Sequence, residues 1–311
     1  MVLPGEGTCL RSSPPRMKIG IFLPTFGAGH QPEYLGALAR AAEAAGVDSL
    51  WAPEHVVLID EYRSSYPYAE DGRFPLDPSA GGLADPFAVL TFLAALTTRV
   101  RLGTGICLVP QRNPVYTAKM VAALDVLSRG RFDFGVGVGW FAEEFAAVGA
   151  DFARRGARTR AYLEVMRRLW TQSQPSYEGE FYRLPPVRFE PKPVQKPHPP
   201  IIFGGESDAA LRRVADLGQG WFGWNVTPEM TAERVAALDR LLNDGGRKRS
   251  DVSIIVSPYT RPTQDLDAMK RYRDAGAEQV VLLLFDGLAT DTVGPAIEKL
   301  AERIIEPARA L

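Results

Sequence analysis

From Met17 onward, short apolar runs alternate with longer segments of helical periodicity. Eight runs have the length and composition of strands: Lys18–Leu23, Ser49–Ala52, Val100–Leu108, Arg131–Val138, Pro200–Phe203, Gly220–Gly223, Val252–Val256 and Gln279–Phe285. Each is followed by a helical pattern, at roughly 32–45, 86–98, 114–127, 158–172, 207–217, 228–243, 264–275 and 291–305. Most of the strand runs are nearly continuous in apolar residues, so both of their faces should be covered. The alternation predicts an α/β protein, a (β/α)8 TIM barrel, with a doubly wound sheet as the alternative.

Small and capping residues mark several of the predicted helix ends. Four glycines stand where a left-handed residue would end a helix: Gly46, Gly130, Gly218 and Gly276. Thr227 before Pro228 is typical of an N-cap followed by the first helical residue. In a barrel of this kind, chemistry is expected at the carboxyl ends of the strands.

Three segments are longer than the connections in a compact barrel. Residues 56–85, after the second strand, are rich in aromatic residues, prolines and glycines, and we expect a lid there. Its aromatic residues include Tyr62, Tyr66, Tyr68 and Phe74. Residues 140–156 follow the fourth strand on the same face. Residues 177–199 are proline-rich and precede the fifth strand, so they should form a hairpin or strap on the opposite face, without a chemical role.

Composition and charge exclude several classes of protein. The 311 residues are 46% hydrophobic and 23% charged, which is ordinary for a globular protein and argues against disorder. The 36 basic and 37 acidic residues nearly balance, so no global charge attracts nucleic acid or an anionic membrane. The apolar run Val280–Phe285 is far shorter than the roughly 20 residues that cross a bilayer. We therefore expect a soluble protein acting on a small molecule.

The first residues and the cysteines point to a reducing compartment. Cys9 and Cys107 have no Cys-x-x-Cys spacing, and residues 1–16 lack the apolar core of a secretory signal. We expect residues 1–16 to be a flexible tail, residues 17–311 to form one domain, and the protein to be cytoplasmic.

The end of the fifth strand is a candidate phosphate site. The strand runs into Gly204, Gly205, Glu206 and Ser207, and a helix follows. Two glycines allow the backbone to come close to a ligand, and free N–H groups at a helix start favour a phosphate. The alternative is a tight turn in which Ser207 only caps the helix.

The fourth strand ends in glycines that invite a dinucleotide-binding interpretation. The spacing from Gly135 through Gly137 to Gly139 is GxGxG, whereas the dinucleotide fingerprint is GxGxxG, so we reject that interpretation. Gly137 and Gly139, before Trp140, could instead leave room for a flat ring to lie against the backbone. Alternatively, they relieve crowding where the strand bends.

His55 and Glu54 close the second strand in the sequence WAPEH. A histidine there could donate a hydrogen bond to a ligand or move a proton near neutral pH. A three-histidine metal site would need His30, His55 and His198 together, but His198 lies in the strap. We therefore predict no catalytic metal.

Other motifs carry less chemistry. Glycines inside the third strand, at Gly103 and Gly105, suggest a bulge or a close ligand, and Cys107 should be buried and inert. The adjacent Glu143 and Glu144 could suggest a glycosidase pair, but neighbouring residues of a helix point in different directions, so we expect a solvated first helical turn. The chain has no GxSxG, P-loop or HExxH motif.

The order of the motifs resembles the bacterial-luciferase-like monooxygenase superfamily. The segments are MKIGIFLPT, GVDSLWAPEH, SSYPY, DPF, LAALTTRVRLGTGICLVPQRNP, LSRGRFDFGVGVGWFAEEF and PPIIFGG with Ser207. More narrowly, the chain is similar to the coenzyme F420-dependent oxidoreductases of that superfamily. The resemblance extends from Met17 to about Trp224 and is most specific from Leu127 to Phe145.

This resemblance implies a deazaflavin or flavin ring at the barrel mouth, with its phosphate at the strand-five loop. It also implies a non-prolyl cis peptide bond among Gly105, Ile106 and Cys107 that backs the ring. His55 matches a position near the ring, and Trp140 with Glu144 matches the segment beside it. Relatives commonly form homodimers, so the resemblance implies one here.

The expected reaction is hydride transfer between coenzyme F420 and a small substrate, with His55 or Glu54 supplying a hydrogen bond or proton. No concentrated basic run is present to hold the acidic tail of F420, and Arg63, Arg73 and Arg112 are scattered. FMN therefore stays open as the cofactor of an oxygen-using monooxygenase. A flavin-binding barrel without turnover is the alternative from another class.

Overall fold

A computed structural model describes residues 16–75, 81–259, 261, 265–284 and 287–311. Most of the predicted N-terminal tail, Cys9, residue 285 of the last predicted strand and residue 264 of a predicted helix lie outside these ranges.

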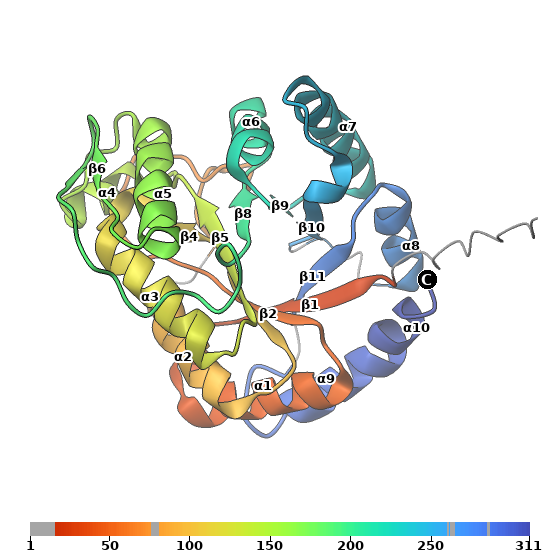
Figure 1. Ribbon diagram of the computed structural model, residues 1–311. Helices are drawn as coiled ribbons and strands as arrows, with labels where there is room; N and C mark the ends of the chain where they lie inside the picture. Colours follow the sequence, from red (N-terminus) through yellow and green to blue (C-terminus); the bar gives the residue numbers. More distant parts are fainter. Residues whose placement is uncertain (1–15, 76–80, 260, 262–264, 285–286) are drawn as a thin grey trace, which may run out of the picture.

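Parallel strands close into one barrel (Figure 1). The strands are β1 Lys18–Phe22, β2 Ser49–Ala52, β3 Arg101–Thr104, β4 Cys107–Leu108, β5 Phe132–Gly137, β8 Ile201–Gly204, β9 Gly220–Trp224, β10 Ser253–Ser257 and β11 Gln279–Leu283. Successive strands pair in parallel, except that β3 and β4 both pair with β5 and not with each other. Because β1 pairs with both β2 and β11 and β3 pairs with β5, the sheet closes. The predicted (β/α)8 barrel is confirmed, and the doubly wound sheet is excluded because such a sheet has open edges.

The predicted third strand is divided into β3 and β4. Both segments pair with β5, so together they occupy one position in the barrel. A cis peptide bond joins Gly105 to Ile106 between them, as the family resemblance implied.

Helices surround the barrel (Figure 1). They are α1 Pro32–Ala45, α2 Pro86–Leu96, α3 Pro114–Leu127, α4 Ala142–Ala147, α5 Arg155–Thr171, α6 Asp208–Leu217, α7 Pro228–Asp244, α8 Leu266–Asp274, α9 Val293–Leu300 and α10 Glu306–Ala308. Proline begins α1, α2, α3 and α7, where its missing N–H is no loss. The Thr227 side chain caps α7 by accepting from the Met230 N–H, as predicted.

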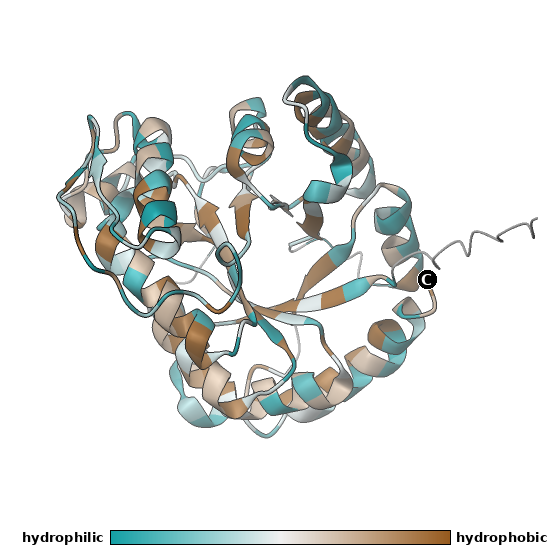
Figure 2. Cartoon of the chain, viewed as in Figure 1, coloured by the Kyte–Doolittle hydropathy of each residue, from teal (hydrophilic) through white to brown (hydrophobic). Residues whose placement is uncertain are grey.

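The core has two layers because residues of each strand point alternately outward and inward. The outward layer of strand side chains packs against buried apolar side chains of the helices. In Figure 2 the helices carry both apolar and polar residues. The inward layer fills the barrel with Trp51, Ile202, Phe222, Ile255 and Val281. The centre of the barrel is therefore occupied, and a ligand must lie above it, at one end.

Three of the four predicted helix-ending glycines have positive φ, namely Gly46, Gly130 and Gly276. The prediction is wrong for Gly218, whose φ is −86°. A Cβ there would lie 3.0 Å from the Phe203 ring and 3.1 Å from the Val214 carbonyl oxygen. Close packing, rather than a left-handed conformation, explains this glycine.

Only part of the proline-rich segment lies at the amino end of the barrel, where we predicted all of it. The segment contains the antiparallel hairpin β6 Tyr177–Glu178 and β7 Arg183–Leu184. The prediction is wrong for its hairpin, because Glu180 pairs with Arg154 and the Tyr182 hydroxyl accepts from Asn113 Nδ2, and both of these partners follow the carboxyl ends of strands. Further along, the Gln195 side chain donates to Asp125 and to the Phe132 carbonyl at the start of β5. These contacts attach the part of the segment around Gln195 to the end of the barrel away from the carboxyl ends of the strands.

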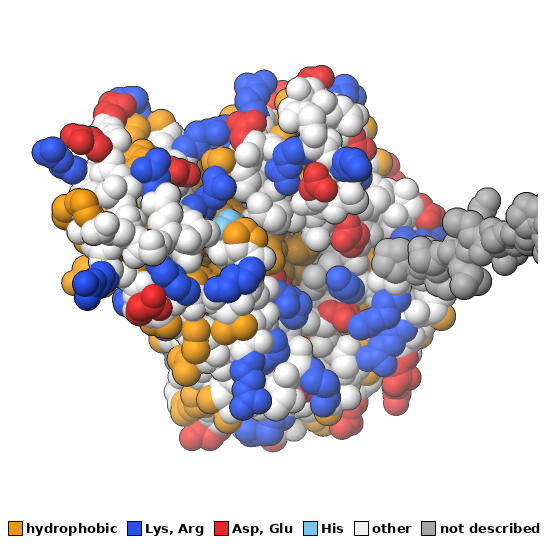
Figure 3. Space-filling view, in the orientation of Figure 1, with side chains coloured by type: hydrophobic (Ala, Val, Ile, Leu, Met, Phe, Trp, Pro, Cys, Tyr) orange, Lys and Arg blue, Asp and Glu red, His pale blue; other side chains and the backbone are white. Residues whose placement is uncertain are grey.

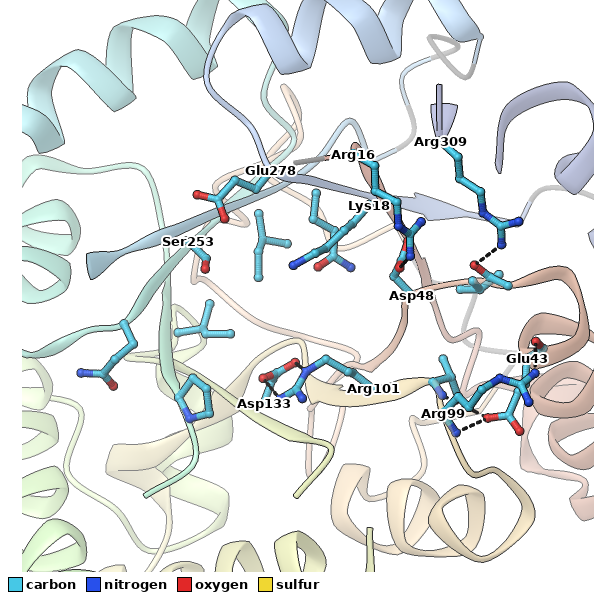
Figure 4. Close-up of a pocket in the computed structure, with 18 of the residues that line it drawn as sticks. Arg16, Lys18, Glu43, Asp48, Arg99, Arg101, Asp133, Ser253, Glu278 and Arg309 are labelled. Atoms are coloured by element: carbon cyan, nitrogen blue, oxygen red, sulfur yellow. Dashed lines mark hydrogen bonds and ion pairs between the residues drawn. The ribbon is translucent and has the colours of Figure 1, made fainter. Parts of the chain in front are cut away.

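A cavity of about 700 Å³ opens at this amino end and is lined by charged residues (Figure 4). Asp48 pairs with Arg16 at 2.5 Å and Asp133 with Arg101 at 2.5 Å. These ion pairs indicate a structural role for the cavity wall. Elsewhere, basic and acidic side chains are interspersed over the face shown in Figure 3, in keeping with the nearly balanced charge. Among the described helices, none is long and apolar enough to cross a membrane.

Glu43, near the end of α1, joins that helix to the segment before β3. Its carboxylate accepts hydrogen bonds from the backbone N–H groups of Thr98, Arg99 and Val100, at 2.9, 2.7 and 3.0 Å. Burial alone would raise the pKa of Glu43, but these hydrogen bonds outweigh it and lower the pKa from 4.5 to about 2. The charged carboxylate therefore stabilises the folded state.

Replacing Glu43 by Gln should lower the free energy of unfolding by about 1 kcal/mol at pH 7, after allowance for solvent screening. The folded-state pKa is depressed, so this stability is present above pH 4.5 and is lost as the pH falls toward 2. Urea denaturation between pH 7 and pH 3 would measure it, with the exposed Glu298→Gln as control. A difference between wild type and Glu43→Gln that stays constant with pH would contradict this assignment.

Candidate functional site

The candidate residues gather at the carboxyl ends of the strands. His55 follows β2, Trp140 follows β5, Glu206 follows β8 and Trp224 ends β9. In a parallel barrel these ends share one face, so side chains distant in the sequence meet there.

His55 is held by the buried carboxylate of Glu144. His55 Nδ1 lies 3.0 Å from Glu144 Oε2, and Glu144 also accepts from the Val56 N–H at 2.6 Å and from Gln111 Nε2 at 3.0 Å. The Glu144 side chain is fully buried. Our prediction of a solvated helical turn is therefore wrong for Glu144, because three donors replace water around its carboxylate.

The other ring nitrogen of His55 remains available. Within the described residues, Nε2 of His55 has no hydrogen-bond partner. A carboxylate at Nδ1 orients the ring and favours a proton on that nitrogen. Nε2 of His55 can therefore exchange a hydrogen bond or a proton with a ligand.

Aromatic side chains surround His55. Its ring meets Phe74, Trp140 and Phe141 edge-on, with centroids 5.0, 5.9 and 6.1 Å away. Tyr62 and Tyr66 pack on Trp140 in turn, at 6.1 and 5.2 Å. We call Tyr62, Tyr66, Phe74, Trp140 and Phe141 the aromatic cluster. It gives the mouth an apolar wall formed jointly by the segment after β2 and the segment after β5.

Glu143, in α4, anchors the predicted lid, residues 56–85, at the mouth. Glu143 Oε1 accepts from the Arg63 N–H at 2.7 Å, and Oε2 accepts from the Ser64 hydroxyl at 2.6 Å. The Ser64 hydroxyl and the Arg63 N–H lower the pKa of Glu143 to about 2. Residues 76–80 of the predicted lid lie outside the described ranges.

Glu206, just after β8, is a second anchor of the same segment. Tyr68 donates its hydroxyl to Glu206 Oε2 at 2.8 Å, and the Trp224 N–H donates to Oε1 at 2.7 Å. Burial raises the pKa of Glu206. Asn225 Nδ2 donates to the Tyr68 carbonyl at 3.3 Å. The segment after β2 thus extends over the mouth and is anchored at two points, one after β5 and one after β8.

The loop after β8 combines a helix cap with free donors. The Ser207 hydroxyl accepts from the Ala210 N–H at 3.2 Å and caps α6. The alternative interpretation, in which Ser207 caps the helix, is therefore correct about the cap. Gly205 has φ +105°, which favours glycine. In the described part of the chain, the backbone N–H groups of Gly205 and Ser207 have no acceptor. They remain available to an anion.

The glycines that end β5 make room for the chain itself. A Cβ on Gly137 would collide with the Ile106 side chain, and one on Gly139 would lie 2.8 Å from the Phe145 ring. Relief of crowding accounts for both positions. Contact of Gly137 and Gly139 with a cofactor ring remains a prediction.

Both carboxylate oxygens of Glu54 accept hydrogen bonds from neighbouring residues. Its carboxylate, in a residue only 5% exposed, accepts from the Leu108 N–H and from Arg112 Nε, the latter at 2.6 Å. Arg112 also pairs with Asp85 at 2.8 Å. Both Glu54 oxygens are therefore engaged, and Arg112 is not free to hold an anionic tail.

Cys107 is fully buried, as predicted, and burial raises the pKa of its thiol. His30 bonds to the Gly82 carbonyl, while buried His198 packs against Trp170. Across the residues the structure covers, no group of three or more His, Cys, Asp or Glu side chains could hold a metal ion.

Sequence reasoning missed Gln111 as a partner of Glu144. Gln111 belongs to the short 3-10 helix Val109–Gln111 after β4, in the sequence LVPQRNP. Its only signal was its place just after a strand end, which many residues share.

Comparison with known proteins gives a consistent result. The profile of the luciferase-like monooxygenase family matches residues 17–302. The uncharacterized protein Rv0953c of Mycobacterium tuberculosis is 33% identical over 294 residues, covering 93% of this chain and 99% of that protein. The FMNH2-dependent dimethylsulfone monooxygenase of Pseudomonas putida is 32% identical over 167 residues, 52% of this chain and 46% of that protein. The coenzyme F420-dependent tetrahydromethanopterin reductase of Methanopyrus kandleri superposes with a TM-score of 0.72 at 16% identity, covering 94% of this chain and 99% of the other.

Replacing Tyr68 by Phe should loosen the segment over the mouth, because buried Glu206 loses one of its donors. We expect the free energy of unfolding to fall by about 1–2 kcal/mol. Limited proteolysis should cleave residues 56–75 several-fold faster. Tyr116→Phe is the control, since Tyr116 is 76% exposed. Equal cleavage rates for the two variants would show that the Tyr68–Glu206 hydrogen bond does not anchor the segment.

Proposed function

Because this chain belongs to the luciferase-like monooxygenase family, we propose that it is an oxidoreductase that uses coenzyme F420. In this proposal a hydride passes between the cofactor and a small organic substrate. The family contains enzymes of this general class, and the fold matches that of a reductase named for F420. The observation that carries the proposal is a mouth in which His55 Nε2 and the N–H groups of Gly205 and Ser207 all lack partners within the described residues.

The residues present fit the group. The N–H groups of Gly205 and Ser207 would hold its phosphate, as backbone donors at a helix start commonly do. The segment around the cis bond between Gly105 and Ile106 would back the ring. When bound, a deazaflavin supplies the hydride chemistry, so the protein's task is placement.

His55 is the residue we assign to proton handling. Its Nε2 would donate or accept a hydrogen bond at the substrate atom where charge develops. Glu144 holds the ring in position through Nδ1. We assign Glu54 a positioning role instead, because Arg112 and the Leu108 N–H already engage both of its oxygens.

The aromatic cluster would exclude water from the reacting atoms. The lid segment contributes Tyr62, Tyr66 and Phe74 to this wall and is anchored through Glu143 and Glu206. Apolar walls strengthen the hydrogen bonds of the few polar groups they enclose.

FMN is the second candidate cofactor. The relative from Pseudomonas putida is named for FMNH2 and is 32% identical over the part that aligns. In that case the chain would be an oxygen-using monooxygenase with the same phosphate site.

Titration of the purified protein with F420 and with FMN, followed by fluorescence, tests the choice. We expect F420 to bind at least tenfold more tightly than FMN, and reduced F420 to be oxidised in the presence of some member of a substrate panel. Tight FMN binding without F420 binding would reverse the assignment. Binding with no substrate-dependent oxidation of either cofactor would favour a non-catalytic flavin-binding barrel.

Replacing His55 by Ala should reduce kcat by about 100-fold or more, since a positioned proton donor or acceptor contributes about that much. The thermal midpoint of unfolding should change far less. His30→Ala is a suitable control, because His30 is exposed and, among the described residues, its ring bonds only to the Gly82 carbonyl. A His55→Ala enzyme as active as the control would remove His55 from the mechanism.

A further inference from the structure

Two arginines on neighbouring helices reach toward one another beside the mouth. Arg155 is the first residue of α5, and its Nε donates to the Gly139 carbonyl at 2.9 Å. Its guanidinium carbon lies 3.9 Å from the centre of the Phe152 ring. Arg213 belongs to α6, and its Nη1 lies 3.4 Å from the place that a Cβ on Gly156 would take. The Arg213 side chain therefore extends from α6 to the start of α5.

These two guanidinium groups lack acidic partners. Of the described residues, none offers Arg213 a carboxylate or a carbonyl at hydrogen-bond distance, and Arg155 has only the Gly139 carbonyl. Asp216, three residues after Arg213 on α6, is no substitute, because it already pairs with Arg160 at 2.5 Å. By contrast, Arg101 and Arg112 each pair with a carboxylate.

The arrangement is electrostatically unfavourable as it stands. Burial lowers the pKa of Arg213, and the positive charges of Arg160 and Arg155 lower it further. Burial also lowers the pKa of Arg155. Half-buried cations with too few acceptors are normally balanced by an anion.

The position of the pair connects it to the proposed cofactor site. Gly139 follows β5, and β5 pairs with β8 through Val136 and Phe203. Two residues after Phe203, the chain reaches Gly205, whose free N–H we assigned to phosphate. The arginines thus lie on the side of the mouth where β5 and β8 end.

We propose that Arg155 and Arg213 form an anion site for the phosphate, or for a carboxylate of the acidic tail, of the cofactor bound in the mouth. The planar guanidinium group matches both of these oxygen anions. This inference rests on the proposed function. It supplies the cationic group that no single basic run in the sequence provided.

The test uses Arg155→Gln and Arg213→Gln, with Arg212→Gln as the matched control because Arg212 is exposed on the same helix. The first readout is the thermal midpoint with and without inorganic pyrophosphate at constant ionic strength. Pyrophosphate should raise the midpoint of wild type and Arg212→Gln by a few degrees, and raise it much less in the other two variants. Citrate in place of pyrophosphate tells a carboxylate site from a phosphate site.

Without added anion, Arg213→Gln should be at least as stable as wild type, since a repulsive charge is removed. Equal pyrophosphate shifts in Arg213→Gln and Arg212→Gln would overturn the site.

The second readout is cofactor affinity. Each site variant should bind F420, or FMN if that is the cofactor, about tenfold more weakly than wild type. Affinity for riboflavin, which lacks the phosphate, should not change. Unchanged cofactor affinity in both site variants would overturn the assignment to the cofactor. If wild type binds neither cofactor, the proposed function fails, whereas a pyrophosphate shift confined to wild type and Arg212→Gln would still support the anion site.

Discussion

The arrangement of the barrel mouth depends on one buried carboxylate. Glu144, in the first turn of α4, accepts from a histidine ring, a backbone N–H and a side-chain amide that come from two other connections. A carboxylate in a residue with no exposed surface requires such partners, because removing it from water costs far more than any one contact returns. Glu144 therefore joins the segments after β2, β4 and β5 and sets the orientation of His55.

The segment after β2 is held again at the rim. Glu143, after β5, and Glu206, after β8, hold the segment after β2 at two points, and both do so through hydrogen bonds to carboxylates rather than through apolar packing alone. Hydrogen bonds to charged acceptors are directional, so they fix where the aromatic cluster lies over His55. The mouth combines a fixed polar floor with an apolar wall, which suits a flat ligand that reacts away from water.

The sequence predicted the barrel well because its signals are local. Continuous apolar runs, prolines at helix starts and the cap at Thr227 each act within a few residues. The buried partners of Glu144 and Glu54 could not be predicted in this way, because their donors come from distant loops that only the closed barrel brings together. The glycines at 137 and 139 show the same limit: the spacing allowed either a ligand or a neighbouring side chain, and Ile106 and Phe145 occupy the space.

The arginines of the proposed anion site could not be predicted from the sequence. Arg63, Arg73 and Arg112 looked like candidates for an anionic tail, but Arg112 is committed to Glu54 and Asp85, and Arg73 lies over the Tyr62 ring at 4.9 Å. Arg155 and Arg213, which have no acidic partner among the described residues, belong to two different helices. Because the two arginines come from two helices, they form no cluster of basic residues in the sequence. Only the folded structure shows that neither guanidinium group has a carboxylate partner among the described residues. That imbalance lies on the side of the mouth where β5 and β8 end, which also carries the N–H groups of Gly205 and Ser207.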